Sequence, residues 1–363
     1  DAIETFVTNL SILVRGSDGV NVLEADALAI GDVFSLTDNG RSVSVRTVNA
    51  DGTTTVNGEA TQSDVITTNL NGDNGSIVVR TVNGSLTLNE GTATDDLDND
   101  AAVVAHGTGN LLLQAAGAGT FLTLNVNADV QSTGGHVTLA APAGVVLGAG
   151  VDVSTGGSGS VDLAGGSGSL VMTDTTTVST VNGDIRMSAG DDVLDQIVLG
   201  DVTAANGNVS LATPGSVLDA GDADAEVTAL GLRVVAGKGF GLLAGNSLSQ
   251  PANAIETAVT TVSILVRGSD GVNLVEADAL VVGDVFSPVD GGRSVSVNTV
   301  NADGTTATNT ENTQSDVVTT ADNGANGSIV VRTLGGHLTL NAGTATDDLA
   351  AGAAVVAHWS GNV

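Results

Sequence analysis

The sequence contains no cysteine and no tyrosine, and it has a single tryptophan among its 363 residues. The absence of cysteine excludes disulfide bonds, thiolate chemistry and cysteine-based zinc sites. Aromatic residues make up only 2% of the chain, which is too little for the aromatic-bearing cores of ordinary globular domains. No run of eighteen or more apolar residues occurs, so the sequence predicts no segment that inserts into a membrane.

Basic residues are also scarce, because 10 Lys and Arg stand against 41 Asp and Glu, giving a net charge of −31. Nucleic acids and anionic membrane surfaces would repel such a chain, so neither is expected as a partner. Yet 41% of the residues are hydrophobic, which is too apolar for a disordered acidic tail. Valine, leucine, alanine and isoleucine, diluted by 49 glycines, predict a thin core of small side chains with frequent turns.

The chain is internally repeated. Residues 1–111 align without a gap to residues 253–363, and about 81 of these 111 pairs are identical. The segment SILVRGSDGV, for example, begins at Ser11 and recurs at Ser263. Such duplication is typical of a tandem array. We therefore predict one complete unit at residues 1–252 and the start of a second copy at 253–363, forming one continuous rod without a linker.

Shorter apolar stretches recur about every 24 residues inside the unit. The pairs Val137/Leu139, Val161/Leu163, Ile185/Met187 and Val209/Leu211 alternate like half-buried strands. Two further series run through Val146, Leu170, Leu194 and Leu218, and through Val153, Val178, Val202 and Val227. Three short strands per 24 residues predict an all-β fold, a right-handed parallel β-helix (β-solenoid) with triangular coils.

Extending the first series predicts about 12 coils, and a rod about 58 Å long at the inter-strand spacing. The series would run through Ile12, Val43, Ile77, Leu111, Val137, Val161, Ile185, Val209, Leu232 and Ile264. Long looped coils are expected at about 11–110 and regular 24-residue coils at about 111–252, and loops on a rigid scaffold often carry binding function. A β-sandwich array is the alternative fold, but it needs no fixed 24-residue register.

Several phrases resemble a known group of proteins. They are GSIVVRTVNGSLTLNEG from Gly75, GGHVTLAAPAGVVLGAG from Gly134 and GNVSLATPGSVLDAG from Gly207. These phrases resemble the coils of filamentous-haemagglutinin-like adhesins and related giant bacterial surface proteins. The resemblance implies a secreted, rod-forming protein on a bacterial cell surface, built from tandem repeats.

Five of the nine arginines follow the second inward residue of a predicted strand: Arg15, Arg46, Arg80, Arg267 and Arg332. Alternation along a strand points this position outward, so the five would form a ladder along the rod. One interpretation is a site for anions or for the carboxylates of a partner. The other is a structural ion-pair ladder with acids of the loops, which the fourfold excess of acids favours.

The segment DDLDND places Asp96, Asp98 and Asp100 at alternate positions, a spacing that suits a hard cation such as calcium. The second copy reads DDLAAG and loses the equivalents of Asp98 and Asp100. Calcium is therefore a candidate ligand that the fold does not require, and no other cofactor is expected. The other acidic turns, at Asp191/Asp192 and at Asp222/Asp224/Glu226, have looser spacing.

The sequence does not predict an enzyme. A β-helix that cleaves polysaccharides would need paired carboxylates, a basic residue and aromatic platforms for sugars, yet Lys238 is the only lysine. The histidines have no catalytic or metal-binding spacing and are expected at the surface or in turns; they are His106, His136, His337 and His358.

The near-identity of whole units predicts a structural segment of a long extracellular fibre or stalk, whose length is set by copy number. Its expected partners are adjoining repeats, copies of itself and neighbouring filaments, through lateral or end-to-end assembly. The alternative is an adhesin module that binds host, cell or matrix ligands through the loops of the long coils. The shortage of aromatic residues favours the structural role.

Overall fold

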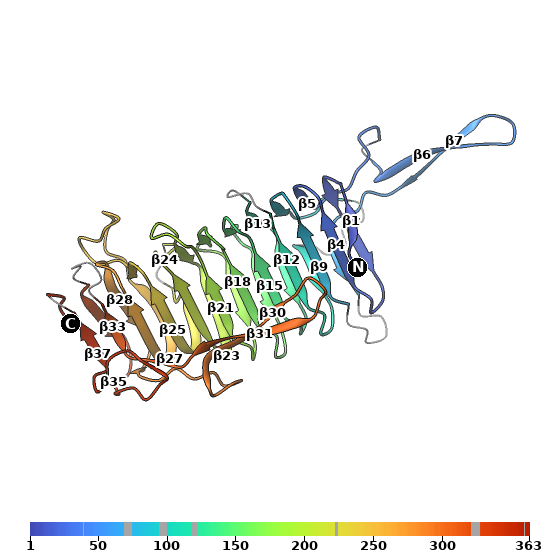
Figure 1. Cartoon of the computed structure of the whole chain (residues 1–363). Helices are drawn as coiled ribbons and strands as arrows, with labels where there is room; N and C mark the ends of the chain where they lie inside the picture. Colours follow the sequence, from blue (N-terminus) through green and yellow to red (C-terminus); the bar gives the residue numbers. More distant parts are fainter. Residues whose placement is uncertain are drawn as a thin grey trace.

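The computed structural model describes residues 1–38, 40–68, 75–93, 100–117, 122–221, 224–320, 327–358 and 360–363. These residues form strands, turns and loops and contain no helix, so they contain no helix able to cross a membrane. One continuous sheet joins 31 strands. Figure 1 shows that this sheet winds into an elongated rod with the two termini at opposite ends. The chain is therefore an all-β parallel β-helix.

The rod has three faces, each a stack of parallel strands with bounds as follows. The first face contains β9 (Ile77–Thr81), β12 (Leu111–Gln114), β15 (Val137–Ala140), β18 (Val161–Ala164), β21 (Ile185–Ser188) and the later parts of β23 (Asp201–Thr213), β25 (Val227–Ala236) and β27 (Ile255–Val266). The second contains β10 (Leu86–Leu88), β13 (Leu124–Val126), β16 (Val145–Leu147), β19 (Leu170–Val171), β22 (Ile197–Leu199), β24 (Ser216–Asp219), β26 (Gly239–Phe240) and β28 (Gly271–Glu276). The third contains β8 (Val65–Thr67), β11 (Ala101–Ala105), β14 (Asp129–Ser132), β17 (Asp152–Thr155), β20 (Thr177–Thr180) and the earlier parts of β23, β25 and β27.

Short strands complete both ends of the rod. The N-terminal end has β1 (Ile3–Thr5), β2 (Asn9–Leu10), β3 (Ile12–Val14), β4 (Val20–Glu24) and β5 (Leu28–Ile30). The C-terminal end has β29 (Leu280–Val282), β32 (Gln314–Ser315), β33 (Val317–Thr319), β34 (Ile329–Thr333), β35 (Leu338–Leu340), β36 (Asp347–Asp348) and β37 (Val355–Ala357). Two antiparallel hairpins lie outside the stacked coils: β6 (Val43–Val48) with β7 (Thr54–Glu59), and β30 (Arg293–Val300) with β31 (Thr306–Asn312).

Alternate residues of each strand point into the rod and form its core. Leu111, Val137, Val161, Ile185 and Val209 stack on one another, and each is fully buried. One hydrophobic cluster extends from the first coils to the second copy. Because the strands of the main sheet pair in parallel, the β-sandwich alternative is wrong.

Of the predicted strand series, one is confirmed and another is wrong. The series through Val153, Val178, Val202 and Val227 is confirmed by direct pairing. The series that contained Leu194 is wrong, because the stacked residues are Val145, Leu170, Ile197 and Val217. Residues 191–196 form a loop, which leaves Leu194 exposed and displaces the register from a strict 24-residue step.

The predicted coil at Val43 does not exist. Ile12 pairs with Val65, and Ile77 pairs with Val20. Ile12 and Ile77 therefore lie in different stacks, contrary to the predicted series, and successive coils stack directly without a coil at Val43. Val43 instead begins the β6–β7 hairpin, whose turn contains Gly52 with a φ of 82°. A glycine with positive φ after three turn residues closes such a hairpin without steric strain.

The two copies meet in a continuous sheet, because β25 and β27 pair over nine residues that include Val227 with Thr257 and Ala236 with Val266. Equivalent strands nevertheless lie on different faces. β8 lies on the third face with β11, whereas its equivalent β33 pairs with the first-face part of β27. β9 lies on the first face, whereas its equivalent β34 pairs at Ile329 with the second-face strand β28. One unit therefore advances around the rod by one face.

Candidate functional site

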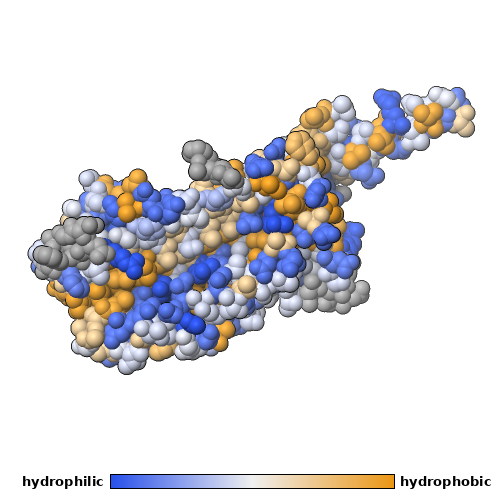
Figure 2. Space-filling view, viewed as in Figure 1, coloured by the Kyte–Doolittle hydropathy of each residue, from blue (hydrophilic) through white to orange (hydrophobic). Residues whose placement is uncertain are grey.

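The two hairpins have almost the same sequence but lie in different places. The hairpin of the second copy, β30–β31 (residues 293–312), folds back along the rod over β15, β18, β21 and β23; we call it the clasp hairpin (Figure 1). The hairpin of the first copy, β6–β7 (residues 43–59), projects away from the rod near the N-terminus, and we call it the free hairpin. The space-filling view in Figure 2 shows the free hairpin standing clear of the molecule.

The clasp hairpin covers the outward side of the first face. One outward residue from each coil stacks there in direct register, and we call this series the docking ladder: Val78, Leu112, Thr138, Asp162, Arg186, Ser210 and Arg233. Its members alternate with core residues along each strand and would point into solvent if the hairpin were absent. Six of the seven residues are instead buried, and Arg186 is largely covered.

The free backbone edge of β30 binds side chains of successive coils. The N–H of Val300 donates to Oγ1 of Thr138 at 2.8 Å, and the N–H of Asn298 donates to Oγ of Ser160 at 2.9 Å. The N–H of Ser296 donates to Oδ2 of Asp184 at 2.7 Å. An unpaired strand edge is a site for association. Here three coils satisfy three alternate amides of that edge.

Buried charges reinforce the contact. Arg186 donates twice to Asp162, from Nε at 3.0 Å and from Nη2 at 2.9 Å. Glu311 of the clasp hairpin lies 3.8 Å from Nη1 of Arg186 and 3.5 Å from Nη1 of Arg233. Burial lowers the pKa of Arg233, and the negative charge of Glu311 opposes that shift. The hairpin therefore supplies a carboxylate beside two arginines of the ladder, of which Arg186 is already paired with Asp162 and Arg233 donates to the hydroxyl of Ser210.

Apolar packing distinguishes the two hairpins most clearly. Val295, Val297 and Val300 of the clasp hairpin are 0%, 0% and 3% exposed, and Val300 packs with Val78 and Leu112. The equivalent valines of the free hairpin are Val43, Val45 and Val48, which are 52%, 53% and 71% exposed. Covering three such side chains is worth on the order of 2–4 kcal/mol.

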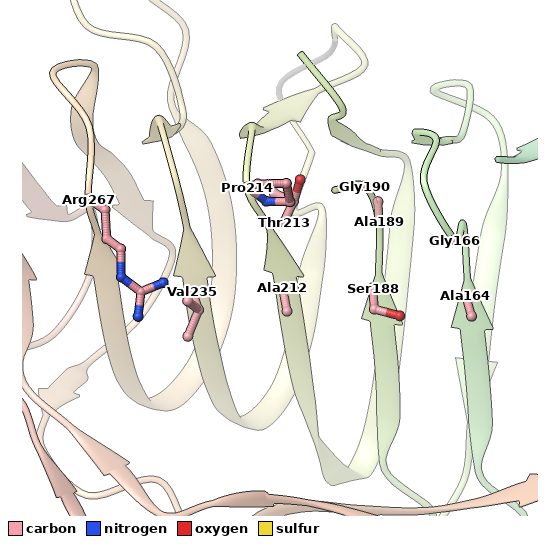
Figure 3. Close-up of a pocket in the computed structure, with 10 residues that line it drawn as sticks. All are labelled: Ala164, Gly166, Ser188, Ala189, Gly190, Ala212, Thr213, Pro214, Val235 and Arg267. Atoms are coloured by element: carbon pink, nitrogen blue, oxygen red, sulfur yellow. The ribbon is translucent and has the colours of Figure 1, made fainter. Parts of the chain in front are cut away.

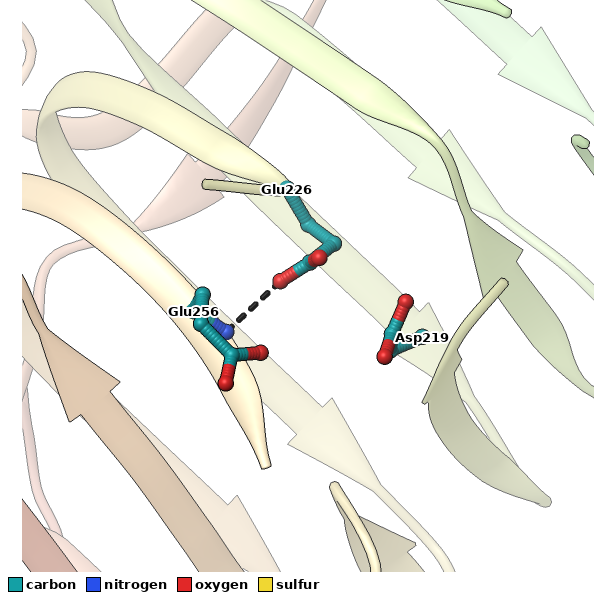
Figure 4. A group of neighbouring side chains, drawn as sticks. All are labelled: Asp219, Glu226 and Glu256. Atoms are coloured by element: carbon teal, nitrogen blue, oxygen red, sulfur yellow. Dashed lines mark hydrogen bonds between the residues drawn. The ribbon is translucent and has the colours of Figure 1, made fainter. Parts of the chain in front are cut away.

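A second cluster lies where the two units join. Carboxylate oxygens of Asp219, Glu226 and Glu256 lie within 4.8 Å of one another, and Figure 4 shows the three side chains around one space. Burial raises the pKa of Glu226 to about 9, and the charge of Asp219 adds to this shift. Oε2 of Glu226 accepts the N–H of Glu256 at 2.6 Å. A proton on Glu226 thus reduces the repulsion within the cluster.

A shallow groove runs along another part of the rod. It is lined mainly by small residues of successive coils, including Ala164, Ser188 and Ala212, and Figure 3 shows Arg267 at one end. Its volume is about 460 Å³, and a neighbouring hollow of about 330 Å³ shares Ala164 and Gly166 with it. None of the described lining residues of either hollow is a carboxylate or a histidine, so the groove holds no acid–base pair.

The predicted arginine ladder is wrong as a single stack. Arg46 lies in the free hairpin, and Arg80 pairs in register with Leu23 and Gln114 on the first face. Arg332 pairs with Val275, while Arg15 and Arg267 follow strands on other coils. The ion pairs among the described residues involve Arg186 and Arg233 instead. The prediction failed because it counted the hairpin as a coil, which placed Arg46 in the stack, and because the strands next to the other four arginines lie on different faces of the rod.

Of the three predicted calcium residues, only Asp100 belongs to the described part of the chain. Asp96 and Asp98 lie outside the described residues. Asp100 is exposed, and its N–H donates to Oε1 of Glu90 at 3.0 Å. A calcium site at this segment therefore stays a prediction.

The residues of the docking ladder were not foreseen as a site. His136 was expected at the surface or in a turn, but it lies under the clasp hairpin with Nε2 3.1 Å from the amide nitrogen of Asn298. Burial lowers its pKa. The available indication was the segment from Val43 to Glu59, whose alternation on both sides of Asp51-Gly52 is typical of a hairpin.

Comparisons with protein-family models, with curated proteins and with solved structures returned no match.

Proposed function

We propose that this chain is a structural repeat segment of a long extracellular fibre or stalk on a bacterial surface. Its units join into a rigid rod whose length is set by the number of copies. The extracellular, bacterial setting is inferred from the resemblance to filamentous-haemagglutinin-like proteins. The role requires no catalysis and no cofactor, and calcium binding is an addition that the role does not need.

The junction between the two copies carries this proposal. β25 of the first unit pairs with β27 of the second over nine residues, and the same hydrophobic cluster fills the rod on both sides. The clasp hairpin then reaches back across the junction to Asn110, whose Nδ2 donates to the carbonyl of Gly304 at 3.1 Å. A spacer needs such stiffness where its units meet, because a flexible linker would let the rod fold back.

An adhesin module is the alternative, with loops of the long coils as the binding elements. The largest such insertion, the hairpin, is used in the second copy to cover the docking ladder. Its apolar side chains are therefore committed to the neighbouring unit, and this favours the structural role.

Electron microscopy of chains with one, two and three further copies of residues 1–252 ahead of Asp1 tests the proposal. We expect straight rods of constant width that lengthen by about 40 Å for each unit of about eight coils. Rods that bend at every unit boundary, or particles whose length does not grow in proportion to copy number, would contradict it.

A further inference from the structure

We propose that the free hairpin is an inter-unit clasp whose binding partner is the docking ladder of another copy of this unit, the one that precedes it in the array. The hairpin would lie across that ladder as the clasp hairpin lies across the ladder of the first unit. The inference rests on the proposed function only in requiring that units be joined in tandem.

Sequence identity at the contacts is the first support. Nearly every clasp residue that contacts the ladder has the same residue at the equivalent position of the free hairpin. Val295, Ser296, Val297, Thr299, Val300 and Glu311 correspond to Val43, Ser44, Val45, Thr47, Val48 and Glu59, and Ser287, which precedes the hairpin and donates to Asp184, corresponds to Ser35. The free hairpin therefore carries the same three valines, the same backbone edge and the same carboxylate for a pair of arginines.

One contact residue differs between the two hairpins, and its change is compatible with docking on the same ladder. Arg46 stands where the clasp hairpin has Asn298, whose N–H and amide lie against Ser160 and His136. Two neighbouring positions contact buried carboxylates: the adjoining Thr299 donates to Asp162, and Ser296, two residues earlier, donates to Asp184. An arginine there adds a positive charge beside two acids, which is electrostatically favourable.

The ladder of the same unit cannot receive the free hairpin, because the clasp hairpin already occupies it over its whole length. The tip of the clasp hairpin reaches the first coils, where Nδ2 of Asn21 donates to the carbonyl of Ala302 at 3.3 Å. The docking ladder that the clasp hairpin binds belongs to the unit that precedes this hairpin in the chain. The same rule assigns the free hairpin to a unit placed before Asp1.

The absence of cysteine allows a direct test by thiol reactivity. The chain to be used contains all 363 residues preceded by a further copy of residues 1–252, joined as Ala252 joins Asn253. A single Val45→Cys substitution is made in the middle copy, and its rate of reaction with a maleimide is measured. We expect a rate at least about tenfold slower than that of Val45→Cys in the 363-residue chain, because docking buries this position.

Two matched variants calibrate the rates. Val297→Cys in the 363-residue chain reports the docked state and should react slowly, whereas Val45→Cys in the foremost copy of the longer chain should react as fast as in the 363-residue chain. Equal, fast rates at the middle copy and in the 363-residue chain would overturn the inference. A fast rate for Val297→Cys would overturn it as well, because the clasp would then not be docked in solution.

This result is separate from the test of the rod. Rods that lengthen regularly while the middle Val45→Cys stays reactive would refute the clasp and leave the spacer role intact. Slow reaction in particles that bend at each boundary would support the clasp and refute the rigid rod.

Discussion

Glycines at one corner of the rod are needed because successive coils touch there. A Cβ atom at Gly159 would lie 2.1 Å from the carbonyl oxygen of Gly135, and one at Gly183 would lie 1.8 Å from that of Gly159. Gly207 repeats the contact one coil later, at 2.2 Å from Gly183. Since all three neighbours are backbone atoms of the stacked turns, a side chain at this corner would force adjacent coils apart.

Gly183→Ala should therefore destabilise the rod by roughly 1–3 kcal/mol, as an overpacked contact does. Gly16 is the control, because a Cβ there would meet no atom within 4 Å. Chemical denaturation of both variants measures the difference. Equal stabilities of Gly183→Ala and Gly16→Ala would contradict the corner contact.

Glu226 makes the stability of the folded chain depend on pH, and the direction of this dependence follows from its raised pKa. Its pKa is raised from 4.5 to about 9 in the folded state, so the folded chain holds a proton that the unfolded chain releases. The contribution of Glu226 to the free energy of unfolding is fully present below about pH 4.5 and is lost as the pH rises towards 9. Between pH 5 and pH 8 this loss is on the order of 4 kcal/mol.

Glu226→Gln keeps an acceptor for the N–H of Glu256 but carries no charge at any pH. We expect the melting temperature of the parent chain to fall more steeply from pH 5 to pH 8 than that of Glu226→Gln. Thermal melts at matched ionic strength measure this, and parallel curves for the two proteins would show that the proton is held elsewhere.

At the scale of the elements, the free hairpin serves as a control for the clasp hairpin, because the two have almost the same sequence but differ in burial. Replacing Val295 and Val297 together by Asp puts two charges under the clasp hairpin, where both valines are fully buried. The cost is limited to the free energy of docking, because the hairpin can detach while the rod stays folded. Val43→Asp with Val45→Asp changes residues that are already half exposed, so little should change.

Limited proteolysis with a protease of broad specificity measures this difference. The parent chain should be cut in the free hairpin and not in the clasp hairpin. The Val295→Asp/Val297→Asp variant should be cut in both hairpins, and the Val43→Asp/Val45→Asp variant should be cut like the parent. A clasp hairpin that stays resistant in the first variant would mean that its valines do not hold it in place.

Sequence periodicity predicted two of the three strand series of the regular coils and missed the series through Leu194, where a loop displaces the register. Val161 and Ile185, for example, stack as their 24-residue spacing indicated. It failed at Val43, because a strand in a hairpin has the same alternation as a strand in a coil. The docking ladder could not be read from the sequence for a related reason. An outward Asp162 has the pattern of a solvated residue until a distant segment covers it.

At the scale of the whole molecule, a net charge of −31 on a narrow rod opposes lateral contact between like filaments. Contacts between units then have to come from surfaces with complementary charges. The clasp hairpin provides one such surface. It places Glu311 against Arg186 and Arg233, two of the nine arginines in the sequence.

The advance of one face per unit sets the symmetry of any filament built from this repeat. Equivalent loops in consecutive units would point in three directions, about a third of a turn apart, and would return to the same side only after three units. A neighbour lying along one side of the filament would meet the same loop at intervals of about 120 Å. Decoration of such a filament would follow a threefold screw, although every repeat has nearly the same sequence.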